Sequence, residues 1–153
     1  MIEARLQDLG ISLPSQPPPA ANYVPFVKVG SLLFISGQLP SWNGELKYIG
    51  KIGRDFSIEE GQEAARICAL NILAHLKIAC EKNFTHVARC VRLGGFVNAT
   101  DEFKEHPQVM NGASDLMFAV FEAQGRHTRA TVGVSSLPFG AAVEVDAIFE
   151  LMV

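Results

Sequence analysis

The segment that begins at Ser57 constrains the fold more than any other part of the sequence. Ser57 and Glu60 form a capping box, in which the serine hydroxyl and the glutamate carboxylate each accept a backbone N–H at the start of a helix. The apolar residues that follow share one helical face: Ile58, Ala65, Cys68, Ile72, Leu76 and Ala79. This stripe predicts a helix that runs to about residues 80–82 and buries one face against another layer of structure.

Runs typical of β-strands lie on both sides of this helix. Residues 23–29 and 32–37 are expected to form a hairpin, with Pro25 placing the first strand at an edge of the sheet. The second of these strands is apolar on both faces, which predicts a central and covered position. Further strands are expected at the following ranges: 84–98, 126–136 and 141–151, with a short edge strand at 45–49.

A second helix is expected over residues 109–123, closed by Gly125, after a helix start at Thr100 and Asp101 that Pro107 interrupts. The resulting order of elements is β-β-(β)-α-β-α-β-β. This order predicts an α+β fold with one mixed sheet and two helices packed on one face.

The face of the sheet that the helices leave open is expected either to be polar or to be buried against another chain. In the last predicted strand, Glu144, Asp146 and Glu150 share one face with Ile148. Such a half-polar surface is more typical of a water-containing interface between subunits than of a dry core.

The N-terminal residues are expected to form an arm that lies against the domain. Residues 2–9 predict a short helix closed by Gly10, and the four prolines among residues 14–19 then exclude helix or a central strand. We therefore expect a helix and Pro-rich arm over residues 1–20 and a single domain over residues 21–153. This division fits a chain of 153 residues, which is enough for about one hydrophobic core.

Composition and charge argue against several classes of protein. Hydrophobic residues make up 48% of the chain and charged residues 19%, which is not the composition of a disordered chain. The formal net charge of −3 lacks the basic excess of proteins that bind nucleic acid. No apolar run is long enough to span a bilayer, and the polar residues 1–5 do not resemble a secretory signal. Cys68, Cys80 and Cys90 lie in apolar surroundings and are expected to be reduced and buried, which predicts a cytoplasmic protein.

The sequence contains no spacing typical of a metal site, and neither a metal nor a cofactor is expected. His75, His86, His106 and His127 are scattered, and no Cys-x-x-Cys pair is present. His75 lies in the middle of the long predicted helix and is interpreted as a structural or surface residue. A nucleophilic cysteine would need a nearby histidine with an orienting group, and the sequence offers none.

Two charged residues suggest chemistry, and each has two interpretations. Arg129 lies between short neutral residues, where it is either a solvated edge residue or a planar fork for a carboxylate. Glu144 lies between two valines, where it either faces solvent or is partly desolvated with a raised pKa that suits proton transfer. If the last two strands pair through the turn at Pro138 and Phe139, both side chains lie on one face of the sheet, about 13 Å apart. A site built across a subunit interface would close that gap.

Several of these residues, taken in order, resemble the Rid (YjgF) family. The resemblance covers the chain from about residue 23 to the C-terminus and rests on these residues: Tyr23, the run Phe34-Ile35-Ser36-Gly37-Gln38-Leu39-Pro40, Asn111, Arg129, Leu137-Pro138 and Glu144. It implies a chorismate-mutase-like α+β fold and a homotrimer with clefts between its subunits. It also implies hydrolysis of reactive enamines and imines, released by pyridoxal-phosphate enzymes, to 2-keto acids and ammonia.

The resemblance also implies roles for individual residues. Arg129 matches the arginine that binds the substrate carboxylate, and Glu144 matches the acid that positions or activates water. The residues that match the pocket are Tyr23, Ser36, Gly37, Asn111 and Thr131. Two positions depart from the pattern, since Thr131 stands where the deaminase subgroup usually has cysteine and His127 where proline or alanine is usual. The expected partner is therefore a small molecule with a carboxylate.

Two other functions stay open at this point. A non-catalytic trimer that binds a small carboxylate metabolite, or acts as a regulatory protein, would explain the altered surroundings of Arg129. An endoribonuclease or translation inhibitor, an old label for some members of the family, fits the acidic balance of the chain and its scattered histidines poorly.

Overall fold

The computed structural model describes residues 2–16 and 22–152. Its centre is a five-stranded mixed sheet in the order β1-β2-β7-β5-β6, in which only β5 and β6 are parallel neighbours. The five strands are β1 (Phe26–Val29), β2 (Leu32–Gln38), β5 (Val87–Asn98), β6 (Thr128–Val134) and β7 (Val143–Leu151). Two short strands, β3 (Ser41–Trp42) and β4 (Glu45–Leu46), form a separate hairpin.

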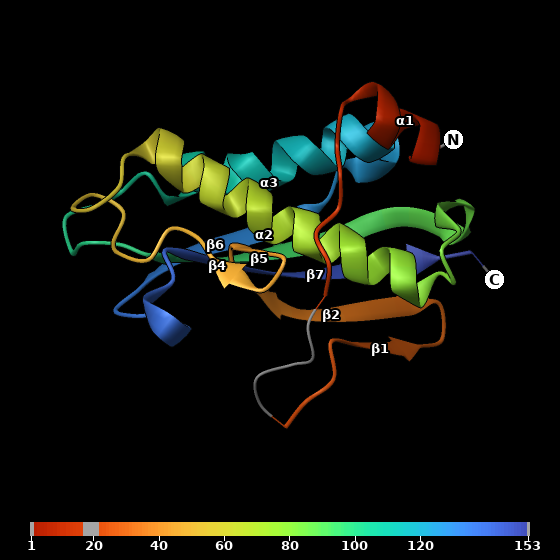
Figure 1. The fold of residues 1–153 in the computed structure, drawn as a ribbon, viewed down its shortest axis with the longest axis horizontal. Coiled ribbons are helices and arrows are strands. Elements are labelled where there is room, and N and C mark those ends of the chain that lie inside the picture. The colour runs from red at the N-terminus through yellow and green to blue at the C-terminus, as the bar shows by residue number, and fades with distance from the viewer. Residues whose placement is uncertain (1, 17–21, 153) are drawn as a thin grey trace.

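Two long helices cover one face of the sheet, as Figure 1 shows. These are α2 (Ile58–Ala79) and α3 (His106–Phe121), and the short helix α1 (Ile2–Asp8) packs on α3. Three 3₁₀ turns complete the chain: η1 (Phe84–His86), η2 (Glu122–Gly125) and η3 (Pro138–Gly140). The segment after α1 crosses α2 on its way to the sheet (Figure 1). The predicted α+β fold, with a mixed sheet and its helices on one face, is confirmed.

The capping box that was expected at the start of α2 is present. The backbone N–H of Glu60 donates to the Ser57 hydroxyl at 3.2 Å, and the backbone N–H of Ser57 donates to the Glu60 carboxylate at 3.1 Å. The stripe that follows is buried, with Cys68, Ile72 and Leu76 fully shielded from solvent. Local sequence therefore fixes both the start of this helix and the face that it packs on the sheet.

Two expected element boundaries are wrong for local reasons. Pro107 lies in the first turn of α3 and does not interrupt a helix, because a proline there loses no hydrogen bond that the helix could have made. Thr100 and Asp101 belong to a turn before that helix. The strand expected from residue 84 begins at Val87, since the three residues before it form η1. Residues 17–19 of the expected Pro-rich arm lie outside the described residues.

The expected pairing of the last two strands is also wrong. Strand β5 lies between β6 and β7, so β7 occupies the centre of the sheet and β6 its edge. Every second residue of β7 is buried, as expected for a strand with a neighbour on each side and helices above one face. Of the short strand expected at residues 45–49, only Glu45–Leu46 forms, and it pairs with Ser41–Trp42 outside the main sheet. Ile49 makes an isolated bridge to Ala141.

The face of the sheet opposite the helices, here called the open face, is uncovered in the single chain. Strand β2 is central, as expected, but only one of its two apolar faces is covered. Exposed apolar side chains of three strands lie on the open face: Val27, Val29, Leu32, Phe34 and Val132. Glu144, Asp146 and Glu150 lie among them, as the sequence predicts.

The cysteines are packing residues of the core. Cys68, Cys80 and Cys90 are all buried and free. Burial raises the pKa of the Cys68 thiol well above its usual range and that of Cys90 to about 12, so neither is a thiolate near neutral pH. Within residues 2–16 and 22–152, three or more His, Cys, Asp or Glu side chains nowhere gather into a group that could hold a metal ion. None of the helices in the same residues is long and apolar enough to cross a membrane.

Gly112 permits the close crossing of α2 and α3. A methyl group at this position would overlap the backbone carbonyl oxygen of Gln62, which cannot move without moving α2. We predict that Gly112→Ala lowers the free energy of unfolding by about 1–3 kcal/mol, although alanine is the better helix former. Urea denaturation measures this loss. Asp115→Ala, at an exposed position of the same helix, is the matched control and should change stability little. Equal stability of Gly112→Ala and the wild type would contradict the proposed crossing.

Candidate functional site

The structure places Arg129 and Glu144 on opposite faces of the sheet, which corrects the expectation that they share one face. Arg129 on β6 is in register with Leu93 of β5, whereas Glu144 on β7 is in register with Phe96 of the same strand. Leu93 is buried beneath the helices, and side chains alternate along a strand, so Phe96 and Glu144 face the open side. Two strand spacings and a shift of three residues put the two Cα atoms about 14 Å apart. One chain therefore presents two separate clusters.

The first cluster, here called the Arg129 cluster, lies where α3 covers the free edge of β6 and consists of Asn111, Ser114, His127, Arg129 and Thr131. Arg129 Nη1 donates to Asn111 Oδ1 at 2.9 Å and to the Ser114 hydroxyl at 3.0 Å. Its Nη2 donates to the backbone carbonyl of Pro107 at 3.4 Å. All three acceptors belong to α3, so the helix fixes the plane of the guanidinium.

The remaining donors of Arg129 are suited to an anion. Nη1 uses both of its hydrogens on α3, and Nη2 uses one. Among the described residues, Nε–H and the second Nη2–H have no partner. A planar pair of N–H donors on one guanidinium is the arrangement that a carboxylate accepts in two parallel hydrogen bonds. The Arg129 cluster can therefore bind a carboxylate without rearranging.

His127 and Ser114 support the guanidinium from behind. His127 Nδ1 lies 2.6 Å from the carbonyl oxygen of Gly125, and Nε2 lies 2.8 Å from the Ser114 hydroxyl. Because a carbonyl can only accept, Nδ1 carries the proton and Nε2 of the neutral ring accepts from Ser114. Burial lowers the pKa of His127, the charge of Arg129 lowers it further, and the bond to Gly125 opposes them. The neutral ring keeps the Ser114 hydroxyl oxygen turned toward Arg129.

Thr131 adds an unsatisfied hydroxyl to this cluster. It follows Arg129 by two residues and shares its face of β6, in register with Gly95. Its Oγ1 is buried and has no hydrogen-bond partner among the described residues. A buried hydroxyl without a partner costs stability, so a bound ligand that supplied one would be favoured.

The second cluster, here called the Glu144 cluster, lies where β7 pairs with β2, on the side of β7 away from β5 and β6. It consists of Tyr23, Ser36, Gly37 and Glu144. The pairing of β2 with β7 shifts register between Ile35 and Gln38, and within this irregularity Gly37 lies against the Glu144 carboxylate. A methyl group at Gly37 would overlap that carboxylate, so glycine is required for the contact.

Glu144 is a half-buried carboxyl group suited to proton transfer. Burial is the main cause that raises its pKa above the ordinary 4.5, and the neighbouring charge of Asp146 raises it further. The pKa of Asp146 is itself raised by burial, while Arg92, 3.4 Å away, acts in the opposite direction. Protonation and deprotonation of Glu144 therefore occur closer to neutral pH than for a solvated glutamate.

Ser36 and Tyr23 play different parts in the Glu144 cluster. The Ser36 hydroxyl donates to the backbone oxygen of Val24 at 2.8 Å, and its N–H donates to Pro25 at 2.9 Å. Ser36 therefore holds the segment before β1 against β2. Tyr23, on that segment, is half exposed and lines a cavity together with Gly37.

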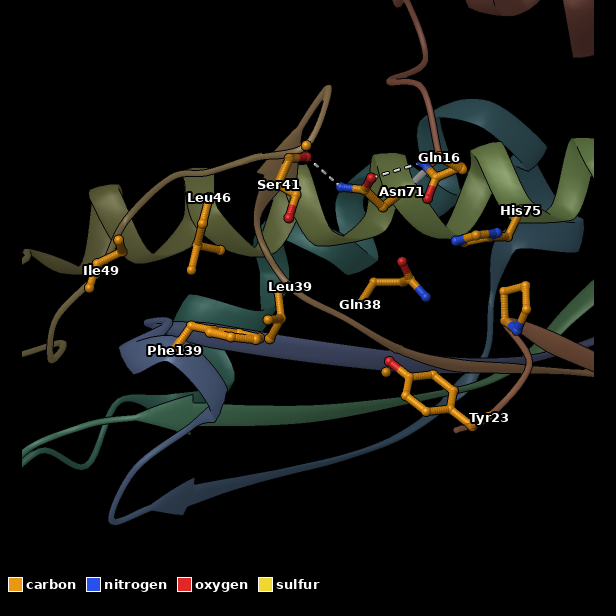
Figure 2. Close-up of a pocket in the computed structure, with 13 residues that line it drawn as sticks. Gln16, Tyr23, Gln38, Leu39, Ser41, Leu46, Ile49, Asn71, His75 and Phe139 are labelled. Atoms are coloured by element: carbon orange, nitrogen blue, oxygen red, sulfur yellow. Dashed lines mark hydrogen bonds between the residues drawn. The ribbon is translucent and has the colours of Figure 1, made fainter. Parts of the chain in front are cut away.

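Figure 2 shows this cavity, which has a volume of about 390 Å³ and lies between α2, β2 and the short β3–β4 hairpin. Tyr23 and Phe139 lie at its sheet side, and Asn71 and His75 project into it from α2 (Figure 2). His75 is only 5% exposed, so it is no surface residue. The cavity and the Glu144 cluster have Tyr23 and Gly37 in common.

Some polar residues of these regions are not among those predicted from the sequence. Ser114 follows Asn111 by three positions on α3, and Asn71 precedes His75 by four positions on α2. Polar pairs at these spacings share one face of a helix. Such pairs are the signal that could have identified Ser114 and Asn71. The part played by Gln16, which reaches Asn71 from the arm, leaves no comparable local signal.

Comparison with known proteins identifies the family and the fold of the chain. A family model described as "YjgF/chorismate_mutase-like, putative endoribonuclease" matches residues 3–151. Protein TCP17 of Trypanosoma cruzi is 48% identical over 151 residues, which cover 98% of this chain and 94% of that protein. The crystal structure of Atu1372, of unknown function, from Agrobacterium tumefaciens is also 48% identical, with a TM-score of 0.91, and covers 98% of this chain and 92% of that one.

A second solved structure shows the same similarity at lower identity. It is described as a "putative endoribonuclease" from Shewanella oneidensis, is 36% identical with a TM-score of 0.95, and covers 99% of each chain. The matched length and the shared fold confirm the resemblance drawn from the sequence. The chain therefore belongs to the YjgF/chorismate-mutase-like family, also known as the Rid family.

Proposed function

We propose that this protein hydrolyses 2-imino and enamino acids to 2-keto acids and ammonia, at clefts between the subunits of a homotrimer. The observation that carries the proposal is the state of Arg129, whose guanidinium is fixed by Asn111, Ser114 and Pro107 and keeps donors available for a carboxylate. A 2-imino acid presents a planar carboxylate next to its reactive C=N bond. Binding the first therefore orients the second.

Glu144 supplies the proton transfers of the proposed reaction. Its carboxylate accepts a proton from a water molecule as the water oxygen bonds to the imine carbon, and it passes this proton to the imine nitrogen as the C=N double bond becomes single. The product is a tetrahedral carbinolamine. Transfer of the hydroxyl proton to the nitrogen, with Glu144 as the relay, then breaks the C–N bond and releases ammonia and the 2-keto acid. The raised pKa of Glu144 suits both directions of transfer.

Two copies of the chain are needed to bring the two clusters to one substrate. The Arg129 cluster lies at the edge of the sheet and Glu144 on the open face, so a cleft that contains both must join the edge of one subunit to the open face of the next. The exposed apolar side chains of the open face support burial against another subunit. A head-to-tail contact that closes into a ring gives every subunit one such cleft, and a trimer is the smallest ring that does so without two-fold pairing.

The proposed location is the cytoplasm, and the proposed substrate is a small molecule. Three free, buried cysteines fit a reducing compartment. The net charge of −3 disfavours binding of the many phosphates of RNA. A small substrate with a single carboxylate needs only one local cation, and in the proposed site this cation is Arg129.

Arg129→Ala tests the grip on the carboxylate. With freshly generated 2-iminobutanoate, we expect kcat/KM for ammonia release to fall about 100-fold, mostly through KM, because a bidentate charge-assisted pair is lost. Arg126→Ala is the matched control, since Arg126 is exposed over the Phe118 ring and makes none of these contacts. Wild-type rates in Arg129→Ala would refute the assigned role. Stabilisation of the wild type by 2-ketobutanoate without turnover would favour the binding function, and salt-dependent RNA binding the ribonuclease.

Glu144→Gln tests the proton transfers. We expect kcat to fall about 100-fold or more, because a glutamine cannot accept the proton of water. In the wild type, kcat/KM should fall as the pH drops through the raised pKa of Glu144, above 4.5, and this limb should vanish in the variant.

The thermal stability of the Glu144→Gln protein shows whether a loss of activity has a structural cause. A raised pKa means that the folded protein binds this proton more tightly than the unfolded chain. The resulting stabilisation is present at low pH and is lost as the pH rises through the raised pKa. Glu144→Gln should therefore unfold at the same or a higher temperature at pH 7. Glu150→Gln, on the same face of β7, is the matched control for activity. An unchanged rate in Glu144→Gln would exclude it from the chemistry.

Mixed oligomers test the shared cleft. When equal amounts of Arg129→Ala and Glu144→Gln chains assemble at random, a cleft is intact only if one subunit supplies Arg129 and the next supplies Glu144, which gives about one quarter of the wild-type activity. Co-expression of two differently tagged chains, followed by assay and determination of the oligomer mass, measures this. Persistent inactivity of verified mixed trimers would show that Arg129 and Glu144 do not act across one interface.

A further inference from the structure

The cavity between α2 and β2 has one polar wall that the N-terminal arm helps to build. Asn71 donates to the backbone oxygens of Ser41 and Ile67, at 2.7 and 2.9 Å, and its Oδ1 accepts from Gln16 Nε2 at 2.9 Å. The arm is tied to the β3–β4 hairpin as well, where the Ser15 N–H donates to the Asn43 side chain at 2.9 Å. These bonds fix the wall before any ligand arrives.

His75 is the group of this wall that lacks a partner. It lies one helical turn after Asn71, is only 5% exposed, and packs its ring near Phe26. Its Nδ1 is buried and has no hydrogen-bond partner among the described residues. A buried ring nitrogen in this state costs stability that an apolar residue of the same shape would not cost. A turn of the ring that brings this nitrogen to the cavity surface would let a hydrogen-bonding group of a ligand remove that cost.

The described lining of the cavity carries no charge. Among the described residues, the side chains that line it include no Asp, Glu, Lys or Arg, and burial lowers the pKa of His75, so the ring is neutral at pH 7. Without a lining cation, an ionised carboxylate placed there would lose its hydration for no compensating charge. Gln38 Nε2 is already bonded to the Ser36 backbone oxygen at 2.9 Å. The chemistry of the wall thus fits a neutral group that can both donate and accept, such as a carboxamide.

The end of the cavity away from His75 is apolar, and the Glu144 cluster borders the cavity at Tyr23 and Gly37. Leu46, Ile49 and Phe139 line that end, as Figure 2 shows, and Gly37 belongs both to the cavity and to the contact with Glu144. A molecule that reacts next to Glu144 can therefore enter the cavity at Gly37 and extend an aliphatic chain toward His75. A volume of about 390 Å³ lies within the range of small-molecule sites.

We propose that this cavity is the subsite for the substrate side chain, and that it selects 2-imino acids whose side chain is long and ends in an uncharged hydrogen-bonding group such as a carboxamide. This inference rests on the proposed deaminase function, which identifies Glu144 as the place of reaction. It gives the N-terminal arm a role in specificity through Gln16. It also gives His75 a role as the residue that hydrogen-bonds the terminal group of the substrate side chain.

A binding experiment tests the subsite without any turnover. Hexanamide and hexanoate have the same length and differ in charge at one end. With ¹⁵N-labelled histidine in the full chain, we expect hexanamide to shift the ring-nitrogen signals of His75 and to leave those of the exposed His86 unchanged. In the Arg129→Ala protein, where the carboxylate cannot be held at Arg129, hexanoate should bind at least about tenfold more weakly than hexanamide, because its carboxylate would be buried without a cation. Equal binding of the two probes to that protein, or no shift at His75 with either, would overturn the proposal.

Substitution of His75 separates a binding role from a structural one. His75→Phe keeps the ring and removes the unpartnered nitrogen, so it should retain or raise the melting temperature while abolishing, in the Arg129→Ala background, the preference for hexanamide over hexanoate. His86→Phe is the matched control and should keep the preference. Gln16→Leu leaves α2 intact and should lower the affinity for hexanamide severalfold. This variant tests the proposal if His75→Phe does not fold. An unchanged preference in both Gln16→Leu and His75→Phe would overturn the assignment.

A matched substrate pair links the subsite to the reaction. The imino acids derived from S-carbamoylmethylcysteine and S-carboxymethylcysteine differ only in a terminal amide against a carboxylate. We expect kcat/KM to favour the amide about tenfold in the wild type and the ratio to approach one in His75→Phe. If the protein hydrolyses 2-iminobutanoate but shows no preference between the two imino acids of the pair, the subsite assignment is wrong and the proposed deaminase function is retained. Absence of turnover with every imine would overturn the deaminase function and, with it, the substrate role of the cavity.

Discussion

The alternation of side chains along β7 is the constraint on which the rest of the structure depends. Its buried residues all point to the helices: Val143, Val145, Ala147, Phe149 and Leu151. They hold β7 between β2 and β5, and the residues between them must face the other way. Glu144 is one of these, while the same rule on the edge strand β6 turns Arg129 toward α3. The pleat that builds the core therefore separates the two charged groups that the proposed chemistry needs. The proposed function therefore requires a second copy of the chain to bring them to one substrate.

The features predicted well from the sequence are those that neighbouring residues decide. The capping box at Ser57 and the apolar stripe after it place α2 correctly, because a helix start and its period are local properties. The pairing of strands is not local. The last two strands are joined by a short turn, and nothing within them indicates that β5 lies between them. The order of the sheet is decided by which strand buries more of its surface, and that depends on the whole core.

The candidate site divides along the same line. Arg129 and Glu144 stand out in the sequence because each is a charged residue among neutral or β-branched neighbours. Their faces were assigned wrongly because the face of a residue in the sheet follows from the pairing. The spacing of Asn111 and Ser114 indicates a shared helix face, but the contacts of Ser114 with Arg129 and His127 join a helix to an edge strand and leave no signal in the sequence. Sequence neighbours can thus identify a residue as a candidate for catalysis or binding. The partners that orient that residue are set by tertiary contacts and are not predicted from the sequence.

The unsatisfied polar groups distinguish structural from functional burial. Glu3 has one buried carboxylate oxygen without a partner, but its other oxygen accepts the N–H of Phe84 at 3.0 Å and so joins α1 to η1. Thr131 and His75 have no such compensation among the described residues, and each leaves a buried atom unbonded at a cost of about 1–3 kcal/mol. Thr131 lies beside the donors of Arg129, and His75 lines the cavity that the Glu144 cluster borders at Gly37. A fold that served stability alone would hold apolar residues at both positions. In the proposed cleft, Thr131 lies near the group that binds the ligand carboxylate, and His75 lies in the cavity that binds the ligand side chain. Both unsatisfied atoms are therefore at places where the proposed ligand needs a hydrogen-bond partner.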